Sequence, residues 1–227
     1  MKKICLLVSL CLSLICHAQQ FSPPNYATIK QKVNAPGSSL YYPKLVAKFQ
    51  VADSSMTLVE KRHLYYGFVH QNKYSPYSRS DYVDSLNAVL KIKKMSRKDF
   101  SKLLNYSDSL LVDNPFNLNA YNYKSYAYSQ LKEVALGEKI VAQKKIIIDA
   151  MMSSGDGLTK ETPFYVISPN HQHFILKLLD LSYNGSQSAF DTIEFLSVDQ
   201  NEQDITGIFF EVSAISEHMS KLFNDRP

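Results

Sequence analysis

The spacing of the apolar residues changes once along the chain, at Gly155-Asp156-Gly157, and this change limits the folds available to it. Before this segment, apolar residues recur every three or four positions over long stretches, as amphipathic helices require. After it, they form short runs rich in β-branched and aromatic residues, which are typical of strands. The sequence therefore predicts an α+β fold, in which a helical region over residues 41–157 precedes a small antiparallel β-meander over residues 158–227 that closes with a helix.

Capping residues and a proline set the helix boundaries of the first region. Thr57 with Glu60, and Ser96 with Asp99, have the spacing of a capping box, in which two side chains satisfy free backbone N–H groups. The residue before Pro115 is driven out of the helical conformation, so a helix ends there. The predicted elements are a mostly extended lead-in over 19–40, a short helix or docked turn at 45–49, and helices over 56–71, 81–90, 96–113, 117–131 and 134–152.

The β region contains one strong turn signal, Asn184-Gly185, between two apolar runs. Asn-Gly in this setting predicts a hairpin, because both turn positions need a positive φ. The run over residues 171–181 also fits the spacing of a helical face, so strand and helix both stay open there. The predicted strands are 164–168, 173–183, 187–198 and 205–212, and the closing helix covers 213–223.

The chain begins with the pattern of a secretory signal. Lys2 and Lys3 precede an apolar run over residues 4–15, and Ala18 ends a small-x-small cleavage site. The run is shorter than the roughly 20 apolar residues that a spanning helix needs. We therefore expect cleavage after Ala18 and a periplasmic or secreted protein. The alternative is a lipoprotein modified at Cys16, which the bulky Ile15 before it disfavours.

Cleavage after Ala18 would remove all three cysteines, Cys5, Cys11 and Cys16. The remaining chain would have no disulfide, no thiol nucleophile and no thiolate metal ligand. Its net charge would fall from +4 to +2, because Lys2 and Lys3 leave with the signal. This balance argues against a nucleic-acid partner. The main basic cluster is expected to be a solvated face with counter-charges nearby, and its members are Lys91, Lys93, Lys94, Arg97 and Lys98.

Patterns for catalysis or metal binding are sparse. His171 and His173 would share one face of a strand and form a possible metal pair, but no third ligand has suitable spacing. The chain has no Gly-x-Ser-x-Gly elbow and no glycine loop that could cradle a phosphate. We therefore predict no catalytic residue, no metal and no cofactor.

Tyrosine is the one compositional excess, with 15 tyrosines and no tryptophan. Tyrosine is an amphipathic contact residue that is common where proteins bind peptides, sugars or one another. In the simpler interpretation, half of the tyrosines in each helical cluster pack into the core, with their hydroxyl groups at the rim of that core. In the sharper interpretation, four side chains line a binding groove on the helical layer: Tyr66, Tyr74, Tyr77 and Arg79.

The stretch over residues 113–131 resembles a tetratricopeptide repeat. Pro115 would end one helix pair, and Ala120 with Tyr121 and Ala127 with Tyr128 give the small-plus-aromatic pairs of the next helix. Lys124 departs from the pattern, and no second good copy follows at about 34 residues. The resemblance implies one degenerate repeat within a helical array.

The whole chain, over roughly residues 40–215, resembles a family of secreted bacterial proteins known as domain-of-unknown-function family 4919. The resemblance implies an envelope or secreted setting in a Gram-negative bacterium and carries no assigned activity. The segments on which it rests are Ala18-Gln19 and residues 64–68, 73–77, 114–117, 155–157, 162–168 and 207–212.

These observations favour a non-enzymatic interaction or scaffold protein of the bacterial envelope, because helical arrays offer a concave surface without a catalytic site. Its partner would be a protein or peptide of the cell envelope, and no transmembrane segment would remain after cleavage. The alternative is a hydrolase of an uncharacterised class with its site at the junction of helices and sheet. A third possibility is a purely structural periplasmic module.

Overall fold

The computed structural model describes residues 21–224. The predicted signal over residues 1–18, with Cys16, lies outside this part. No helix within it is both long enough and apolar enough to cross a membrane. The helices are α2 (Tyr26–Val33), α3 (Tyr42–Gln50), α4 (Leu58–Gly67), the 3-10 turn η1 (Phe68–His70), α5 (Val83–Leu90), α6 (Arg97–Asp113), α7 (Leu118–Leu131), α8 (Val134–Met152), α9 (Pro169–Leu178) and α10 (Ser213–Asn224). The strands are β1 (Phe164–Tyr165), β2 (Tyr183–Phe190), β3 (Ile193–Val198) and β4 (Gly207–Glu211).

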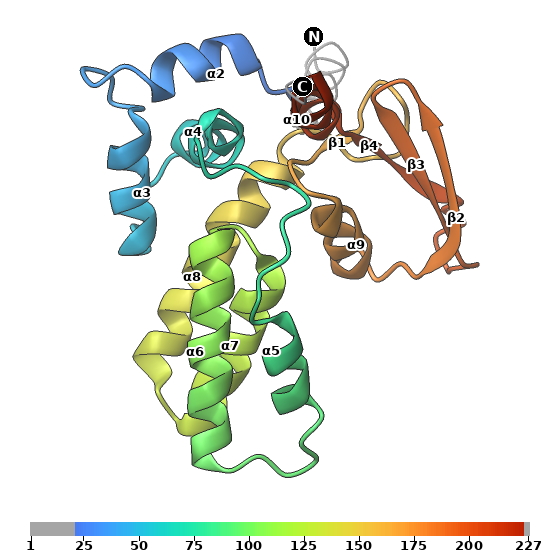
Figure 1. Cartoon of the computed structure of the whole chain (residues 1–227). Coiled ribbons are helices and arrows are strands. Elements are labelled where there is room, and N and C mark those ends of the chain that lie inside the picture. Colours follow the sequence, from blue (N-terminus) through green and yellow to red (C-terminus); the bar gives the residue numbers. More distant parts are fainter. Residues whose placement is uncertain (1–20, 225–227) are drawn as a thin grey trace, which may run out of the picture.

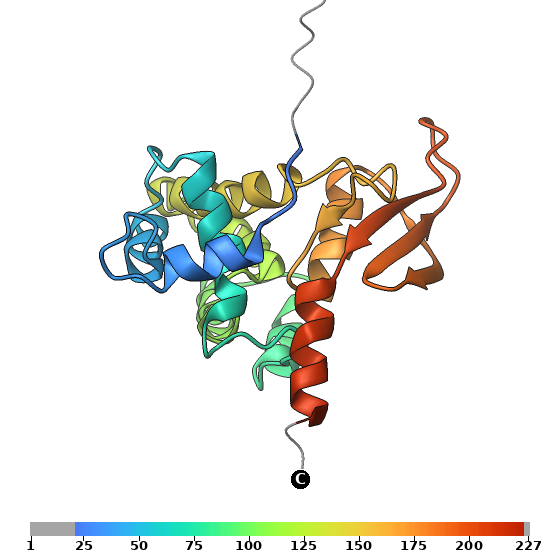
Figure 2. The same cartoon turned by 90° about the horizontal axis from the view of Figure 1, so that it is seen from above.

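The predicted α+β class is confirmed. Helices α5–α8 stand side by side as a column, with α2, α3 and α4 around its upper end, and the sheet lies on the far side of α9 (Figure 1). Seen from above, the helical layer and the sheet occupy opposite sides of the molecule, with α10 between them (Figure 2).

The capping residues act as the sequence predicts. The Thr57 hydroxyl accepts from Glu60 N–H at 3.2 Å, and the Glu60 carboxylate accepts from Thr57 N–H at 2.8 Å. Ser96 and Asp99 make the same reciprocal pair at the start of α6. Helix α7 begins after Asn117, whose side chain accepts from Ala120 N–H at 3.2 Å. These bonds satisfy N–H groups that have no partner inside the helix.

One continuous core joins the helices to the sheet. It runs from Ile29 in α2 through α4 and α8 to Phe210 in β4 and Ile215 in α10. A smaller cluster fills the lower column, where Ala120 and Ala127 are fully buried and let α6 and α7 approach closely. Strands β3 and β4 therefore share the core of the helical layer, whereas most of β2 is exposed.

Strands β2, β3 and β4 form the predicted antiparallel meander, and the short β1 adds to it in parallel beside β4. The hairpin turn was predicted in the wrong place. Phe190 pairs with Ile193, so the turn is Asp191-Thr192, and Asp191 supplies the positive φ of 59°. Gly185, with a φ of 92°, instead lies inside β2 at a register shift between β2 and β3.

The open choice over residues 171–181 is resolved in favour of a helix. Pro169 stands in the first turn of α9, where a missing N–H costs nothing. The buried face of α9 consists of His171, Gln172, Ile175 and Leu176. Residues three and four positions apart share one face of a helix, whereas in a strand the side chains of neighbours such as His171 and Gln172 would point to opposite faces.

The extended lead-in predicted over residues 19–40 is wrong in part, because it contains α2. The Asn25 side chain caps this helix by accepting from Thr28 N–H at 2.9 Å, and the helix buries Ile29 and Val33. The prolines of this segment, Pro23, Pro24 and Pro36, flank α2 and do not interrupt it.

Gly155 lets the chain double back between the helical region and the sheet. A Cβ at this position would lie 2.2 Å from the Pro163 carbonyl oxygen. We expect Gly155→Ala to lower the free energy of unfolding by about 2 kcal/mol, because the backbone must shift to relieve this clash. Urea unfolding followed by circular dichroism measures the effect. Gly37→Ala is the matched control, since nothing lies within 4 Å of its Cβ position, and equal stability of the two variants would contradict the close approach.

Candidate functional site

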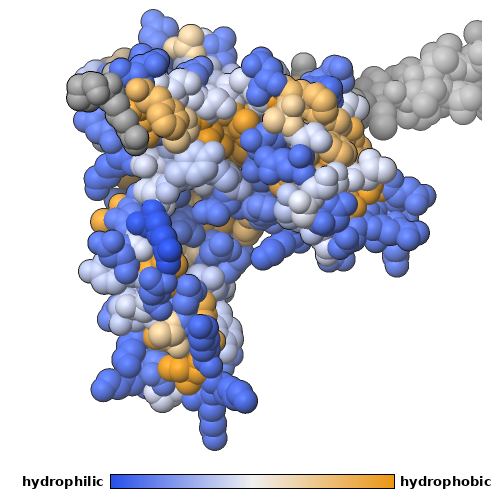
Figure 3. Space-filling model, turned by 45° about the vertical axis from the view of Figure 1, so that its right-hand side comes forward, coloured by the Kyte–Doolittle hydropathy of each residue, from blue (hydrophilic) through white to orange (hydrophobic). Residues whose placement is uncertain are grey.

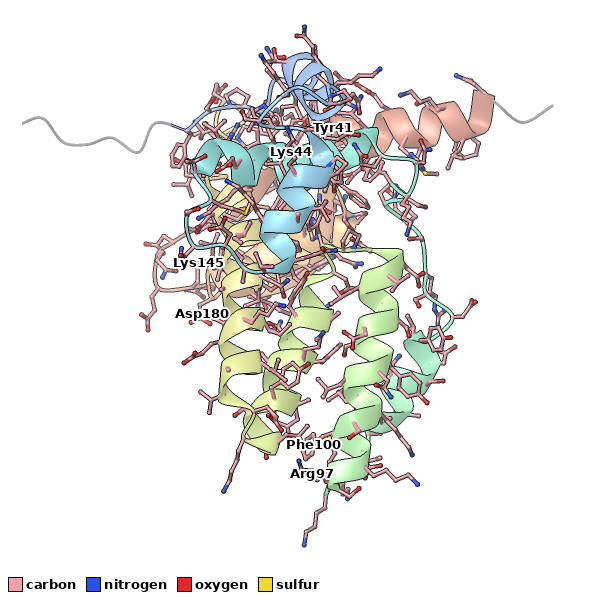
Figure 4. The ribbon with its side chains drawn as sticks, turned by 90° about the vertical axis from the view of Figure 1, so that its left-hand side faces the viewer. Tyr41, Lys44, Arg97, Phe100, Lys145 and Asp180 are labelled. Carbon is pink, nitrogen blue, oxygen red and sulfur yellow. The ribbon has the colours of Figure 1, made fainter. Side chains whose placement is uncertain are left out.

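A pocket with a volume of about 630 Å³ lies beside α3 at the upper end of the column. This volume lies within the range of about 300–1,000 Å³ that ligand sites occupy. Helix α3 forms one wall, α4 with η1 and the segment 71–73 forms another, and the upper end of the column closes the base. Figure 4 looks onto this side of the molecule, with α3, which carries Lys44, in front of the upper column. We call it the α3 pocket.

The floor of the α3 pocket is aromatic and apolar. The Phe49 ring lies edge-on to Phe116 at 5.8 Å, and Phe68 lies edge-on to Phe116 at 5.3 Å. Leu64 and Tyr121 complete this floor, and all five side chains are buried in the main core. A floor that also belongs to the core is held rigid by close packing, so the pocket is preformed.

Side-chain amides surround this floor. Gln143 of α8 donates from Nε2 to the Phe49 carbonyl oxygen at 3.0 Å, which fixes the orientation of its amide. No group within residues 21–224 donates to the Oε1 atom of Gln143, so this atom is available as an acceptor. Asn34, Gln50 and Asn72 add exposed amides at the rim. Each amide carries both a donor and an acceptor, as a peptide bond does.

The lining of the α3 pocket carries little charge. Lys73 is its one permanent cation, and the described lining includes no aspartate, glutamate, serine or cysteine. Burial lowers the pKa of His70, whose Nε2–H donates to the Tyr26 carbonyl oxygen at 3.2 Å, so this ring is neutral at pH 7. Burial also raises the pKa of the Tyr42 hydroxyl, which therefore stays a hydrogen-bond donor.

The predicted groove of Tyr66, Tyr74, Tyr77 and Arg79 does not form, because two of the four side chains are buried. The Tyr66 hydroxyl donates to backbone carbonyl oxygens of Ala150 and Tyr165, each at 3.3 Å. The Tyr74 hydroxyl donates to the Ile167 carbonyl oxygen at 3.0 Å. Tyr66 thereby joins α4 to α8 and β1, and Tyr74 reaches the segment after β1.

Tyr77 and Arg79 do lie close together, on a separate and more polar hollow of about 290 Å³. Tyr77 is 60% exposed, and Arg79 forms an exposed ion pair with Asp84 at 2.6 Å. Asp113, Asn117 and Pro169 also line this hollow. An exposed ion pair of this kind contributes little to stability.

The two histidines predicted as a possible metal pair are not brought together. They lie on opposite sides of α9, where His171 is buried and His173 is exposed, with its ring 5.2 Å from Tyr183. The prediction failed because residues two apart share a face of a strand but not of a helix. Within residues 21–224, no group of three His, Cys, Asp or Glu side chains could hold a metal ion.

His171 has a structural role at the junction of helices and sheet. Its Nε2 lies 2.9 Å from the Phe116 carbonyl oxygen, which can only accept, so Nε2 carries the proton. Its Nδ1 then accepts from the Tyr65 hydroxyl at 2.7 Å, and the Tyr65 oxygen accepts from Ile167 N–H at 3.3 Å. We call this arrangement the Tyr65–His171 chain. Burial lowers the pKa of His171 to about 4.

No direct signal in the sequence marks the α3 pocket, because its lining comes from segments far apart in the chain. One indirect signal existed. Three segments that carry the family resemblance supply lining residues: 64–68 supplies Leu64 and Phe68, 73–77 supplies Lys73, and 114–117 supplies Pro115 and Phe116.

The depressed pKa of His171 makes stability depend on pH. The unfolded chain takes up this proton near its ordinary pKa of 6.5, whereas the folded chain takes it up only near 4. The unfolded state therefore binds more protons between these values, and we expect stability to fall as the pH drops from 6.5 towards 4, by about 3 kcal/mol in total.

The His171→Gln variant isolates this effect. We expect it to be about 2 kcal/mol less stable than the wild type at pH 7, because buried hydrogen bonds are lost, and to lose less stability between pH 7 and pH 5. Urea unfolding at the two pH values gives both numbers. His173→Gln, on the exposed side of the same helix, should keep the full wild-type dependence. A His171→Gln variant with an unchanged pH dependence would refute the assignment.

Comparison with known proteins gives one match. The model of the domain of unknown function DUF4919 matches residues 27–221, which is most of the chain. No curated protein matches, and no solved structure matches. The chain therefore belongs to the DUF4919 family.

Proposed function

We propose that this protein is an exported, non-enzymatic binding protein of the bacterial envelope, and that the α3 pocket holds an extended peptide segment of a protein partner. Export is supported by the basic, apolar and small-x-small pattern of residues 1–18. Binding is supported by a preformed, concave pocket of about 630 Å³ at the top of the helical column.

The single observation that carries the proposal is the combination of an aromatic floor with a rim of amides. Extended peptides expose alternating side chains and a row of backbone N–H and C=O groups. The floor of Phe49, Phe68 and Phe116 suits one apolar side chain, while Asn34, Gln50 and Gln143 offer donors and acceptors for the backbone. Lys73 at the rim favours a segment with an acidic side chain or a terminal carboxylate.

Binding without covalent chemistry is the simplest use of this lining. Hydrolysis by side chains needs a nucleophile or carboxylates placed beside a general base. His171 lines a hollow of about 10 Å³, which has room for about one water molecule, and both of its ring nitrogens are already engaged in hydrogen bonds. The hydrolase alternative thus gains no specific support at the helix–sheet junction.

We also propose that residues 113–131 form part of a tetratricopeptide-like helical array. Helices α6, α7 and α8 are consecutive neighbours in the column, and Ala120 and Ala127 are fully buried where α6 and α7 meet. Arrays of helical repeats characteristically present concave surfaces to extended partners. The α3 pocket would then be the concave end of a short array that α3 closes.

Filling the pocket tests the proposal. Val46 lies on the pocket side of α3, so Val46→Trp places a large ring in the binding space while leaving the buried floor intact. Peptides selected from a random display library on the wild-type protein are expected to bind this variant at least tenfold more weakly, because the indole occupies their site. Fluorescence polarisation with labelled peptides gives the Kd values.

Val51→Trp is the matched control. Val51 follows the same helix, is 69% exposed and does not line the pocket, so the selected peptides should bind this variant as they bind the wild type. Two results would oppose the proposal: selected peptides that bind Val46→Trp unchanged, or a library that yields no binder.

A further inference from the structure

The far end of the helical column carries a concentration of positive charge that the α3 pocket does not use. The loop between α5 and α6 turns at the lower end of the molecule, away from the sheet and the pocket (Figure 1). In Figure 4, Arg97 and Phe100 mark this end of α6. We call residues 91–102 the basic tip.

The basic tip differs in charge from the rest of the protein. Residues 91–102 hold six basic side chains and one acidic side chain, a net charge of +5. Residues 21–224 together hold 22 basic and 20 acidic side chains, a net charge of +2, so the remainder carries −3. The charge is therefore polarised, with a net positive charge at one end of the column and a net negative charge over the remainder.

Within the described residues, Asp99 is the one acidic side chain that forms an ion pair with this cluster. Lys102 lies 3.9 Å from Asp99, and none of the other five cations makes an ion pair within residues 21–224. The Asp99 carboxylate is already engaged, because it accepts from the Ser96 N–H and hydroxyl to cap α6. The N-terminus of α6 adds a partial positive charge at the same place. Five exposed cations so close together repel one another, and an anionic surface would relieve that repulsion.

Apolar side chains lie among these cations. Ile92 is 37% exposed and lies between Lys91 and Lys93. Met95 is half-buried and follows Lys94 in the same loop. In Figure 3 the lower end of the column is largely hydrophilic, with an apolar spot enclosed by it. Cations around an exposed aliphatic side chain are typical of segments that rest on anionic lipid headgroups and insert an apolar residue at the interface.

We propose that the basic tip docks the protein onto a membrane surface rich in anionic phospholipid headgroups, with Ile92 inserted among them. A lipid surface suits this tip better than a nucleic acid does. Proteins that bind single strands offer aromatic rings for stacking along a charged groove, whereas residues 91–98 contain no aromatic side chain and project as one compact loop. Docking by the tip would leave the α3 pocket, at the other end of the column, open to a partner.

Vesicle binding tests this proposal. The chain from Gln19 onwards is mixed with vesicles of phosphatidylglycerol and phosphatidylcholine in equal parts, and with vesicles of phosphatidylcholine alone, at 50 mM and 300 mM salt. We expect sedimentation with the anionic vesicles only, weakened by the higher salt. The triple variant Lys91→Gln, Lys93→Gln, Lys94→Gln should bind about 100-fold more weakly, and Ile92→Ser about tenfold more weakly.

The matched control removes three lysines elsewhere. Lys30, Lys32 and Lys177 are exposed, lie on α2 and α9 and make no ion pair within the described residues, so their triple change to Gln should lower binding less than threefold. The proposal is overturned if the control variant binds as weakly as the tip variant does. It is equally overturned if the wild-type protein does not bind the anionic vesicles at 50 mM salt. It is also overturned if a short single-stranded RNA binds the tip more tightly than the vesicles do.

Discussion

A buried histidine fixes the relation between the helical layer and the sheet. The Tyr65–His171 chain ties α4 to α9, and it also reaches the backbone at Ile167 and Phe116. Three parts of the chain that are distant in sequence, at Tyr65, at Phe116 and over residues 167–171, are thereby held by one neutral, fully satisfied set of hydrogen bonds. Buried polar groups of this kind specify a unique arrangement, because any other packing would leave a donor or acceptor without a partner.

The position of the α3 pocket depends on the same chain. His171 holds the Phe116 carbonyl oxygen, while the Phe116 ring meets Phe49 and Phe68 on the pocket floor. The pocket is thus built on the core that joins helices to sheet. A ligand in the α3 pocket would contact side chains that are already fixed, which keeps the entropic cost of binding low. The basic tip, in contrast, lies beyond the smaller cluster of the lower column and is independent of this arrangement.

Local signals in the sequence predict the helices well, whereas the hairpin turn, the burial of the tyrosines and the α3 pocket depend on tertiary packing. The capping boxes at Thr57 and Ser96 and the stop at Pro115 act over a few residues, so they could be recognised without the fold. The hairpin turn was misplaced because Asn184-Gly185 and Asp191-Thr192 can both supply a positive φ, and only pairing with β3 distinguishes them. The sequence cannot distinguish Tyr66 and Tyr74 from groove residues, because a tyrosine whose hydroxyl donates to a buried backbone carbonyl is the same letter as an exposed tyrosine. The α3 pocket itself could not be predicted, since ordinary apolar residues and amides become a site only when α3 packs across the column.

The most direct test of the account is methyl NMR of the protein titrated with a peptide selected for binding. The account predicts shifts at the methyl groups of Val46, Leu64 and Leu111, which line the α3 pocket. Leu86 and Val89 belong to the cluster of the lower column and should stay unchanged. Shifts confined to Val83 and Leu110, which line the hollow with Tyr77 and Arg79, would place binding elsewhere and contradict the account.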